Sequence, residues 1–201
     1  RKVRIELKYD DINRKTDEIR PNDQDISYEY DLDVIGPVER ITDQAGTARF
    51  FYDNRLRKDR EIRTIDDLSW TSEWRYDSMD RVTWEKHPNE KEVNYKYNNQ
   101  GLLESASSLV SNIDYNANGQ IKQLTRNNGV TTAYDYYPGN LRLRTLKTPS
   151  HQDYFYTFDN KGNVKTVEDK LEPYKEIFKY DDLDRLTNAG GNNYSAEYRY
   201  N

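Results

Sequence analysis

The sequence contains no cysteine, only two histidines and one methionine, and no apolar run long enough to span a lipid bilayer. Without cysteine the chain has neither a disulfide framework nor thiol chemistry. No signal-peptide pattern stands at its start. The net charge is −5 and the two signs are well mixed, which disfavours nucleic-acid binding because that function needs a basic stripe. We therefore expect no nucleic-acid partner and no membrane span.

The composition favours a thin folded layer over a thick globular core. Hydrophobic residues make up 34% of the chain and charged residues 33%, a balance that on its own leans towards disorder. The 18 tyrosines point the other way, because disordered segments are poor in aromatic residues. A tyrosine buries a large ring and keeps a polar hydroxyl, which we expect to face water.

An aromatic residue recurs every 18 to 24 residues and divides the chain into ten similar units. These aromatic residues are Tyr9, Tyr30, Tyr52, Tyr76, Tyr97, Tyr115, Tyr136, Phe158, Tyr180 and Tyr200. Another apolar residue precedes each of them by two positions: Leu7, Tyr28, Phe50, Trp74, Tyr95, Ile113, Tyr134, Tyr156, Phe178 and Tyr198. A spacing of two places both side chains on one face of a β-strand, so each unit is predicted to contain a strand with two apolar side chains on one face.

Turn-forming residues follow each aromatic pair. Asp or Asn comes directly after the second aromatic residue in most units, for example Asp77, Asp159 and Asp181, and can start a turn by bonding the backbone ahead of it. Four positions after the aromatic residue stand Asn13, Asp80, Gly101, Gly119, Gly162 and Asp184. Gly, Asn and Asp tolerate positive φ best, so we predict one recurring left-handed turn position.

A second turn splits each unit into two strands. Asn128-Gly129 is the strongest short-range hairpin signal in the chain. Residues 55–68 are the one stretch that could be helical, but they are too charged and too rich in β-branched residues for a helix. The fold class is therefore all-β: a long antiparallel meander of hairpins that curls into part of a hollow β-shell.

We expect a single array of about ten repeats over residues 1–201, with no linker and no second domain. Because the chain starts at Arg1 and ends directly after another aromatic pair, we also expect it to be a fragment of a longer shell-forming protein.

The recurring pattern Y-x-Y-D-x-x-G-R-L resembles the YD repeats of Rhs proteins. Residues 74–107 and 113–137 resemble the repeat region of SpvB-like proteins and of insecticidal toxin-complex B and C components, and residues 41–53 resemble a further segment common there. The resemblance implies a cocoon of wound β-sheet. It also implies the residues that build the repeat: Tyr30, Trp74, Tyr76, Asp77, Arg81, Tyr95, Tyr97, Gly101, Tyr115, Gly119, Tyr134, Tyr136, Tyr156, Phe158, Asp159, Gly162, Phe178, Tyr180, Asp181 and Arg185.

The function implied by the resemblance is that of a shell segment in a secreted bacterial protein, which encloses a C-terminal toxin or effector polypeptide. Its partners would be the enclosed polypeptide and other shell or toxin-complex subunits. The alternative is a module on the bacterial cell surface that recognises a glycan or a receptor protein, as related shells do in teneurins and wall-associated proteins. The family's C-terminal core segment with its self-cleaving aspartates is absent from these 201 residues.

Two units depart from the family pattern. The stretch from Tyr52 to Leu56 lacks the residues that would complete the turn before Arg55, and Tyr137-Pro138-Gly139 replaces the Asp that usually follows the second aromatic residue. We expect both turns to form with altered local twist.

No cluster of residues predicts catalysis, and we expect neither an enzyme nor a cofactor or metal site. His87 and His151 lie in different predicted turns and are interpreted as solvated turn residues. Trp70, Trp74 and Trp84 are interpreted as packing residues, with sugar stacking as the alternative. The arginines after the turns, Arg14, Arg81, Arg142 and Arg185, are expected to pair with turn aspartates or to cover aromatic rings, and otherwise to form a groove for acidic ligands.

Overall fold

The computed structural model describes residues 4–21, 25–172 and 174–200, and within these ranges it contains nineteen β-strands and no helix. By contacts the chain divides into two compact units, Arg1–Tyr95 and Lys96–Asn201. The boundary falls inside a strand. Since helices are absent from the described ranges, none of them offers a membrane-spanning helix. A single array of repeats over residues 1–201 stays a prediction.

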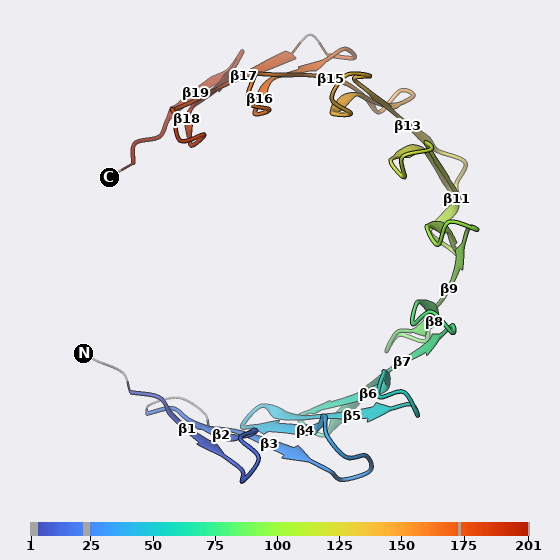
Figure 1. Cartoon of the computed structure of the whole chain (residues 1–201), viewed down its shortest axis with the longest axis vertical. Coiled ribbons are helices and arrows are strands. Elements are labelled where there is room, and N and C mark those ends of the chain that lie inside the picture. Colours follow the sequence, from blue (N-terminus) through green and yellow to red (C-terminus); the bar gives the residue numbers. More distant parts are fainter. Residues whose placement is uncertain (1–3, 22–24, 173, 201) are drawn as a thin grey trace. The chain divides into compact units, whose positions relative to one another are not determined.

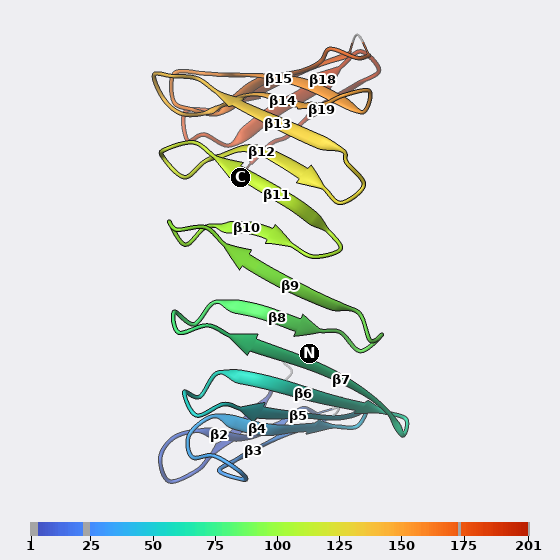
Figure 2. The same ribbon diagram turned by 90° about the vertical axis from the view of Figure 1, so that its right-hand side faces the viewer.

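In the first unit each strand pairs antiparallel with the next one in the chain (Figures 1 and 2). The strands are β1 (Glu6–Tyr9), β2 (Lys15–Ile19), β3 (Ile26–Tyr30), β4 (Val38–Asp43), β5 (Gly46–Tyr52), β6 (Lys58–Ile65), β7 (Leu68–Tyr76), β8 (Val82–Lys86) and β9 (Glu92–Tyr97), the last of which crosses into the second unit. Residues 58–65, inside the one candidate helix, form β6, as their charge and β-branching favour.

The second unit continues the same antiparallel order, and its sheet curves across its width (Figure 1). Its strands are β10 (Leu103–Ala106), β11 (Val110–Tyr115), β12 (Ile121–Arg126), β13 (Thr131–Tyr136), β14 (Leu143–Thr148), β15 (Gln152–Phe158), β16 (Val164–Asp169), β17 (Tyr174–Tyr180), β18 (Leu186–Gly191) and β19 (Tyr194–Glu197). The predicted all-β meander of hairpins is confirmed.

The sheet is one layer thick and has almost no core. Among the described residues the buried hydrophobic side chains are Val93, Ala106, Ile113 and Ala189. The other apolar side chains are half-buried or exposed, because no second layer covers either face. Stability must therefore come from contacts between neighbouring strands, which are the unit of stabilisation in a sheet.

In five units the strand register places the first residue of the aromatic pair against an apolar neighbour, whereas Leu7, Phe50 and Trp74 lie opposite glutamates. Tyr28 lies opposite Ile41, and Tyr134 lies opposite Leu146. Directly opposed residues share a face of the sheet, so the aromatic pairs form one face, which we call the aromatic face. Residues between the paired aromatics, such as Glu29, point to the opposite face, where Glu29 lies opposite Arg40.

A β-bulge recurs directly before the second aromatic residue of most units. The register shifts between Arg75 and Tyr76, between Asp135 and Tyr136, and between Lys179 and Tyr180, and the same shift occurs in five other units. A bulge increases the local right-handed twist of a strand pair. Because the bulge repeats at the same place, the twist adds up along the sheet and favours curvature.

The second turns differ from their sequence signals. Asn128-Gly129 does form a hairpin, but of these two residues only Gly129 has positive φ (81°). The turn is closed by the Arg126 amide, which donates a hydrogen bond to the Val130 carbonyl. The hairpin with two left-handed central residues instead joins β6 to β7. It consists of Asp66 and Asp67, with φ of 47° and 63°.

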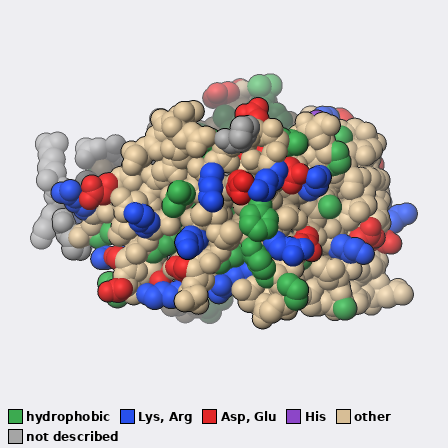
Figure 3. Space-filling model, turned by 90° about the horizontal axis from the view of Figure 1, so that it is seen from above, with side chains coloured by type: hydrophobic (Ala, Val, Ile, Leu, Met, Phe, Trp, Pro, Cys, Tyr) green, Lys and Arg blue, Asp and Glu red, His purple; other side chains and the backbone are tan. Residues whose placement is uncertain are grey.

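Basic and acidic side chains are interspersed on the face of the molecule seen in Figure 3, with hydrophobic side chains scattered between them. This distribution agrees with the mixed charge of the sequence.

Candidate functional site

The turn after each aromatic pair has one recurring backbone geometry. In the turn at Asp77, the Asp80 amide donates to the Asp77 carbonyl (3.2 Å) and the Asp77 amide donates to the Arg81 carbonyl (3.0 Å). Asp80 has φ of 63°, so the turn is a type I turn closed by one left-handed residue. The same left-handed position is occupied in the other turns by Asn13, Leu56, Gly101, Gly119, Gly162 and Asp184.

The aspartate of the turn caps it with its side chain. Asp77 Oδ1 accepts from the amides of Met79 (2.9 Å) and Arg81 (3.0 Å), and Asp77 Oδ2 accepts from Arg81 Nε (2.7 Å). Asp10, Asp53 and Asp181 make the same three contacts. A carboxylate saturated in this way is a turn cap, and the paired arginine holds it in place.

The expected defect in the turn after Tyr52 is not present. Leu56 takes the left-handed position with φ of 59°, and Arg57 takes the arginine position and pairs with Asp53. The prediction was wrong because it aligned Arg55 with the turn arginine, although Arg57 fits the spacing. The turn at Tyr137 is one residue longer than the others: the Tyr137 amide donates to the Arg142 carbonyl (2.8 Å).

Seven of the turns are tied to the next unit by a tyrosine hydroxyl. The second aromatic residue of a unit donates its hydroxyl to a backbone carbonyl that lies just after the preceding turn. The pairs are Tyr30 to Lys15, Tyr52 to Val38, Tyr76 to Lys58, Tyr115 to Leu103, Tyr136 to Ile121, Tyr180 to Val164 and Tyr200 to Leu186, at 2.6 to 3.0 Å. The expectation that these hydroxyls face water was wrong, since the sheet brings a carbonyl within reach. Burial raises the pKa of the phenols of Tyr76 and Tyr136.

The turn arginine adds a second tie to the next unit. The guanidinium of Arg57 lies 4.7 Å from the centroid of the Tyr76 ring, and its Nη1 donates to the Asp77 carbonyl (2.8 Å) and to Asp80 Oδ1 (2.6 Å). Arg14 stacks in the same way on Tyr30, and Arg185 on Tyr200. The expectation that the turn arginines pair with turn aspartates or cover aromatic rings is confirmed. Arg14 and Arg185 do both, Arg81 pairs with Asp77, and Arg142 lies over the Phe158 ring.

We call this arrangement the repeat junction: the turn Asp and Arg of one unit with the second aromatic residue of the next. Ring stacking, an ion pair and two kinds of hydrogen bond meet there, and each crosses from one unit to its neighbour. The junction can hold strands in register. The carboxylates and guanidiniums of the junction are paired with each other.

Comparison with known proteins identifies this geometry. Residues 76–169 match the family model described as Teneurin YD-shell. The chain has the YD-shell fold. Over these residues the chain is similar to the YD-shell family, in line with the resemblance of the sequence to YD repeats.

Solved structures of toxin complexes are similar over almost the whole chain. The crystal structure of TcdB2-TccC3-Cdc42 has a TM-score of 0.78 at 18% identity, covering 93% of this chain and 12% of that one. A Photorhabdus luminescens Tc holotoxin pore with a mutation in TccC3 has a TM-score of 0.77 at 19% identity, with the same coverage. A search of the curated proteins found no match. The chain thus spans about an eighth of the length of these structural relatives.

The remaining residues expected to build the YD repeat lie on the aromatic face or in the turns. Tyr95 donates to Glu85 Oε1 (2.5 Å), and Phe158, which has no hydroxyl, packs edge-on against Tyr137 with ring centroids 6.3 Å apart. Phe178 lies opposite Ala189. Asp159 caps its turn through the amides of Lys161, Gly162 and Asn163, and Trp74, Tyr97, Tyr134 and Tyr156 are half-buried. Their role as repeat-building residues stays a prediction.

The histidines and tryptophans have local partners. His87 Nε2 lies 3.2 Å from Glu85 Oε1, and His151 Nδ1 lies 2.7 Å from the Pro149 carbonyl, both in turns. No group of three or more potential metal ligands occurs within residues 4–21, 25–172 and 174–200. Trp84 Nε1 donates to Glu92 (3.1 Å), whereas the Trp70 side chain is 38% exposed on β7.

Removing one junction hydroxyl tests its contribution. We expect Tyr136→Phe to lower the free energy of unfolding by about 1 kcal/mol, because the bond to the Ile121 carbonyl (2.8 Å) is lost while the ring stays. Tyr134→Phe is the matched control, since its hydroxyl has no hydrogen-bond partner in the described part of the chain. Urea unfolding of both variants checks the prediction, and equal stability of the two would contradict it.

The turn aspartates predict a loss of stability in acid. The hydrogen bond from Arg14 holds the pKa of Asp31 at about 2, and that from Arg57 holds the pKa of Asp53 at about 2. Unfolded aspartates titrate near pH 3.9, so this stability is present above about pH 4 and is lost as the pH falls towards 2. We expect the midpoint temperature of thermal unfolding to fall between about pH 4 and pH 2, and to fall less in the Asp53→Asn variant. A flat profile in the original chain would show that these ion pairs add nothing.

Substituting two glycines of positive φ is expected to lower the stability of the fold by different amounts. Gly119 and Gly162 have φ of 82° and 107°, so valine at either position should cost about 1 to 3 kcal/mol. At Gly162 an added Cβ would also lie 2.1 Å from Arg142 Nη2 and displace it, whereas at Gly119 its nearest neighbour is Leu102 Cδ1 at 3.9 Å. We therefore expect Gly162→Val to unfold at lower urea concentration than Gly119→Val, and the reverse order would contradict the role of Arg142.

Proposed function

We propose that this chain is a wall segment of a hollow YD-repeat shell that encloses a C-terminal toxin or effector polypeptide of a secreted bacterial protein. The observation that carries the proposal is the single-layer sheet, in which Val93, Ala106, Ile113 and Ala189 are the buried hydrophobic side chains of the described residues. A protein that folds around its own core would bury many more. A thin sheet whose neighbouring repeats are held together by the repeat junctions is suited to form the wall of a shell.

The mechanism is steric. In a continuous sheet the backbone groups of each strand are satisfied by its neighbours, so a closed shell has few free edges. The repeat junctions hold neighbouring strands together by contacts that do not depend on a core, such as the bond from the Tyr76 hydroxyl to the Lys58 carbonyl (2.6 Å). Such a wall can keep an enclosed polypeptide from solvent and from proteases.

The similarity to TcdB2-TccC3 structures supports the assignment to a toxin-complex type of shell. The partners of this segment would be the enclosed polypeptide and the other shell subunits. Secretion, or display on the bacterial surface, is part of the same proposal.

Imaging of the full-length protein tests the proposal. Electron microscopy should show a hollow particle with this segment in its wall, and a C-terminal segment protected from added protease. Protection should disappear in a variant with a broken wall, such as one carrying the substitution of Gly46 described in the Discussion. A solid particle, or a C-terminal segment cleaved as fast in the original protein as in the variant, would refute the container.

A second candidate is a surface module that binds a glycan or a receptor protein. It is favoured by the exposed apolar side chains of β7, where Leu68 is 62% and Trp70 38% exposed. A glycan array probed with this chain should show binding that Trp70→Ala abolishes. Trp84→Ala is the control, because Arg75 already stacks on that ring at 4.3 Å. Absence of binding, or equal loss in both variants, would remove this candidate.

A further inference from the structure

The second unit carries an apolar side chain between two lysines on the face opposite the aromatic face. Along β17 the residues on the aromatic face are half-buried, whereas Lys175, Ile177 and Lys179 are exposed. Phe178 lies on the aromatic face, opposite Ala189, so its neighbours Ile177 and Lys179 point to the other side. The exposed fraction of Ile177 is 48%.

Ile177 is exposed on one side because the next strand offers it no side chain. Its partner on β18 is Gly190, which in turn lies opposite Ser195 of β19. A glycine leaves the backbone of β18 uncovered at this point, and an open cavity of about 470 Å³ lies beside Ile177. We call this cavity the lysine groove. Its lining includes Lys175, Ile177, Lys179, Asn188, Gly190 and Ser195.

The lysine groove is positively charged. None of its lining residues is acidic, and two of them are lysines. Within the described residues neither the Lys175 ammonium nor the Lys179 ammonium has a hydrogen-bond or ion-pair partner. Both ammoniums are therefore available to an anionic group of a ligand.

The carboxylates that share this face on the flanking strands are already paired. Glu168 of β16 lies opposite Lys175, but its carboxylate binds Lys170 Nζ at 2.6 Å. Glu197 of β19 lies 3.2 Å from Arg199 Nε. Each of these two carboxylates has a cation of its own, so the charges of the two groove lysines remain in excess.

We propose that the lysine groove binds an extended acidic polypeptide segment that carries an apolar residue between two carboxylates. Lys175, Ile177 and Lys179 occupy every second position of a strand, about 6.6 Å apart. An extended peptide laid along β17 repeats its own side chains at the same spacing. Its acidic residues at positions i and i+4 then meet the two lysines, and its apolar residue at i+2 fills the hollow beside Ile177 and over Gly190.

The exposed Ile177 distinguishes a polypeptide from other polyanions. An acidic polysaccharide supplies carboxylates for the lysines but no apolar side chain for the hollow between them. This inference is separate from the container, because it concerns the face opposite the aromatic pairs and requires no enclosed cargo.

The test is a titration of the whole chain with a dye-labelled, capped Glu-Thr-Leu-Thr-Glu peptide at low salt, followed by fluorescence anisotropy. The double variant Lys175→Gln/Lys179→Gln is expected to bind about tenfold more weakly, because both charge-assisted contacts are lost. Lys96→Gln/Lys122→Gln is the matched control, since it removes the same charge from exposed positions of β9 and β12, and it should bind as tightly as the original chain. A Gln-Thr-Leu-Thr-Gln peptide should lose affinity as the first double variant does, and added salt should weaken binding of the acidic peptide.

Ile177→Ser gives a second readout that leaves the lysines in place. On the original chain the peptide with Leu should bind about threefold more tightly than a Glu-Thr-Ser-Thr-Glu peptide, because Leu buries apolar surface against Ile177. On Ile177→Ser the two peptides should bind alike.

Four results would overturn the proposal: no binding to the original chain, equal losses in the two double variants, equal affinity for the Gln peptide, or no preference for Leu over Ser. Polygalacturonate that binds more tightly than the Leu peptide through Lys175 and Lys179 would overturn the choice of a polypeptide.

Discussion

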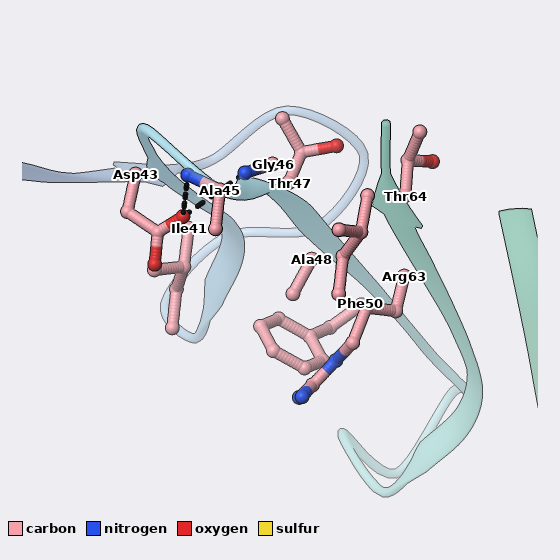
Figure 4. A pocket seen from close by; sticks show the side chains of 10 residues that line it. Ile41, Asp43, Ala45, Gly46, Thr47, Ala48, Phe50, Arg63 and Thr64 are labelled. Carbon is pink, nitrogen blue, oxygen red and sulfur yellow. Dashed lines mark hydrogen bonds between the residues drawn. The ribbon is translucent and has the colours of Figure 1, made fainter. Parts of the chain in front are cut away.

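Replacing Gly46 with alanine is expected to lower the free energy of unfolding by about 3 kcal/mol or more, because the added methyl group collides with backbone. An ideal Cβ at Gly46 would lie 1.9 Å from the Thr64 carbonyl oxygen and 2.9 Å from its carbonyl carbon. Figure 4 shows Gly46 at the β4–β5 turn, beside Thr64 of the neighbouring strand. Relief requires β5 and β6 to separate where Gly46 pairs with Ile65.

The turn itself cannot move to make room. The amides of Ala45 and Gly46 donate to Asp43 Oδ1 at 2.9 and 3.0 Å, shown as dashed lines in Figure 4, and they hold the glycine against β6. The same residues border a small cavity of about 200 Å³ that also includes Phe50. Separation of the strands would therefore open this cavity to water as well.

Gly129→Ala is the matched control for Gly46→Ala. Gly129 also has positive φ (81°), but an added Cβ would meet nothing within 4 Å. Its cost is the conformational penalty alone, about 1 kcal/mol. Urea unfolding of both variants gives the comparison, and a loss at Gly46 no larger than that at Gly129 would contradict the steric argument.

The second large effect is expected at Glu39, whose side chain is fully buried at 0% exposure. Its Oε1 accepts from the amides of Leu32 and Val34, both at 2.9 Å, and its Oε2 accepts from the amide of Asp33 at 2.8 Å. The loop after β3 lacks the common turn, and this carboxylate supplies the acceptors that hold it. Glu39→Leu should cost about 3 to 5 kcal/mol, since three amides lose a charged partner.

Two variants separate the hydrogen bonds of Glu39 from its charge and size. Glu39→Gln keeps one acceptor oxygen and should cost less than Glu39→Leu. Glu29→Gln removes a carboxylate that pairs with Arg40 at the surface and should change stability by less than about 1 kcal/mol. Thermal and urea unfolding of the three variants measure these changes in stability. A loss in Glu39→Leu as small as that in Glu29→Gln would show that the loop does not depend on this carboxylate.

The strand-and-turn pattern could be predicted because each of its signals is local. The spacing of Tyr134 and Tyr136 places both on one face of a strand, and Gly119 or Asp80 can take positive φ in its own turn. Such preferences are properties of a few consecutive residues. These preferences repeat with the sequence. In the turns after the aromatic pairs the structure follows them except at Leu56 and in the longer turns at Asp31 and Tyr137.

The misjudged turns show where local signals fail. Leu56 is a residue that disfavours positive φ, so the turn at Asp53 looked incomplete. It forms because the bonds from Arg57 to Asp53 and onward to Asp80 of the next repeat outweigh the strain. The hairpin predicted at Asn128-Gly129 does form, and a second tight hairpin at Asp66-Asp67 joins the two long strands β6 and β7.

The sequence by itself determined that this chain forms antiparallel hairpins with aromatic residues on one face, because period, alternation and turn chemistry act over a few residues. Only the tertiary structure decided that the tyrosine hydroxyls bond the preceding repeat, that Arg57 reaches the turn of the next, and that Glu39 is enclosed by a loop. These contacts join residues about one repeat apart, or close a single loop, and depend on strand register. Register is a property of paired strands, so no single stretch of the sequence contains it.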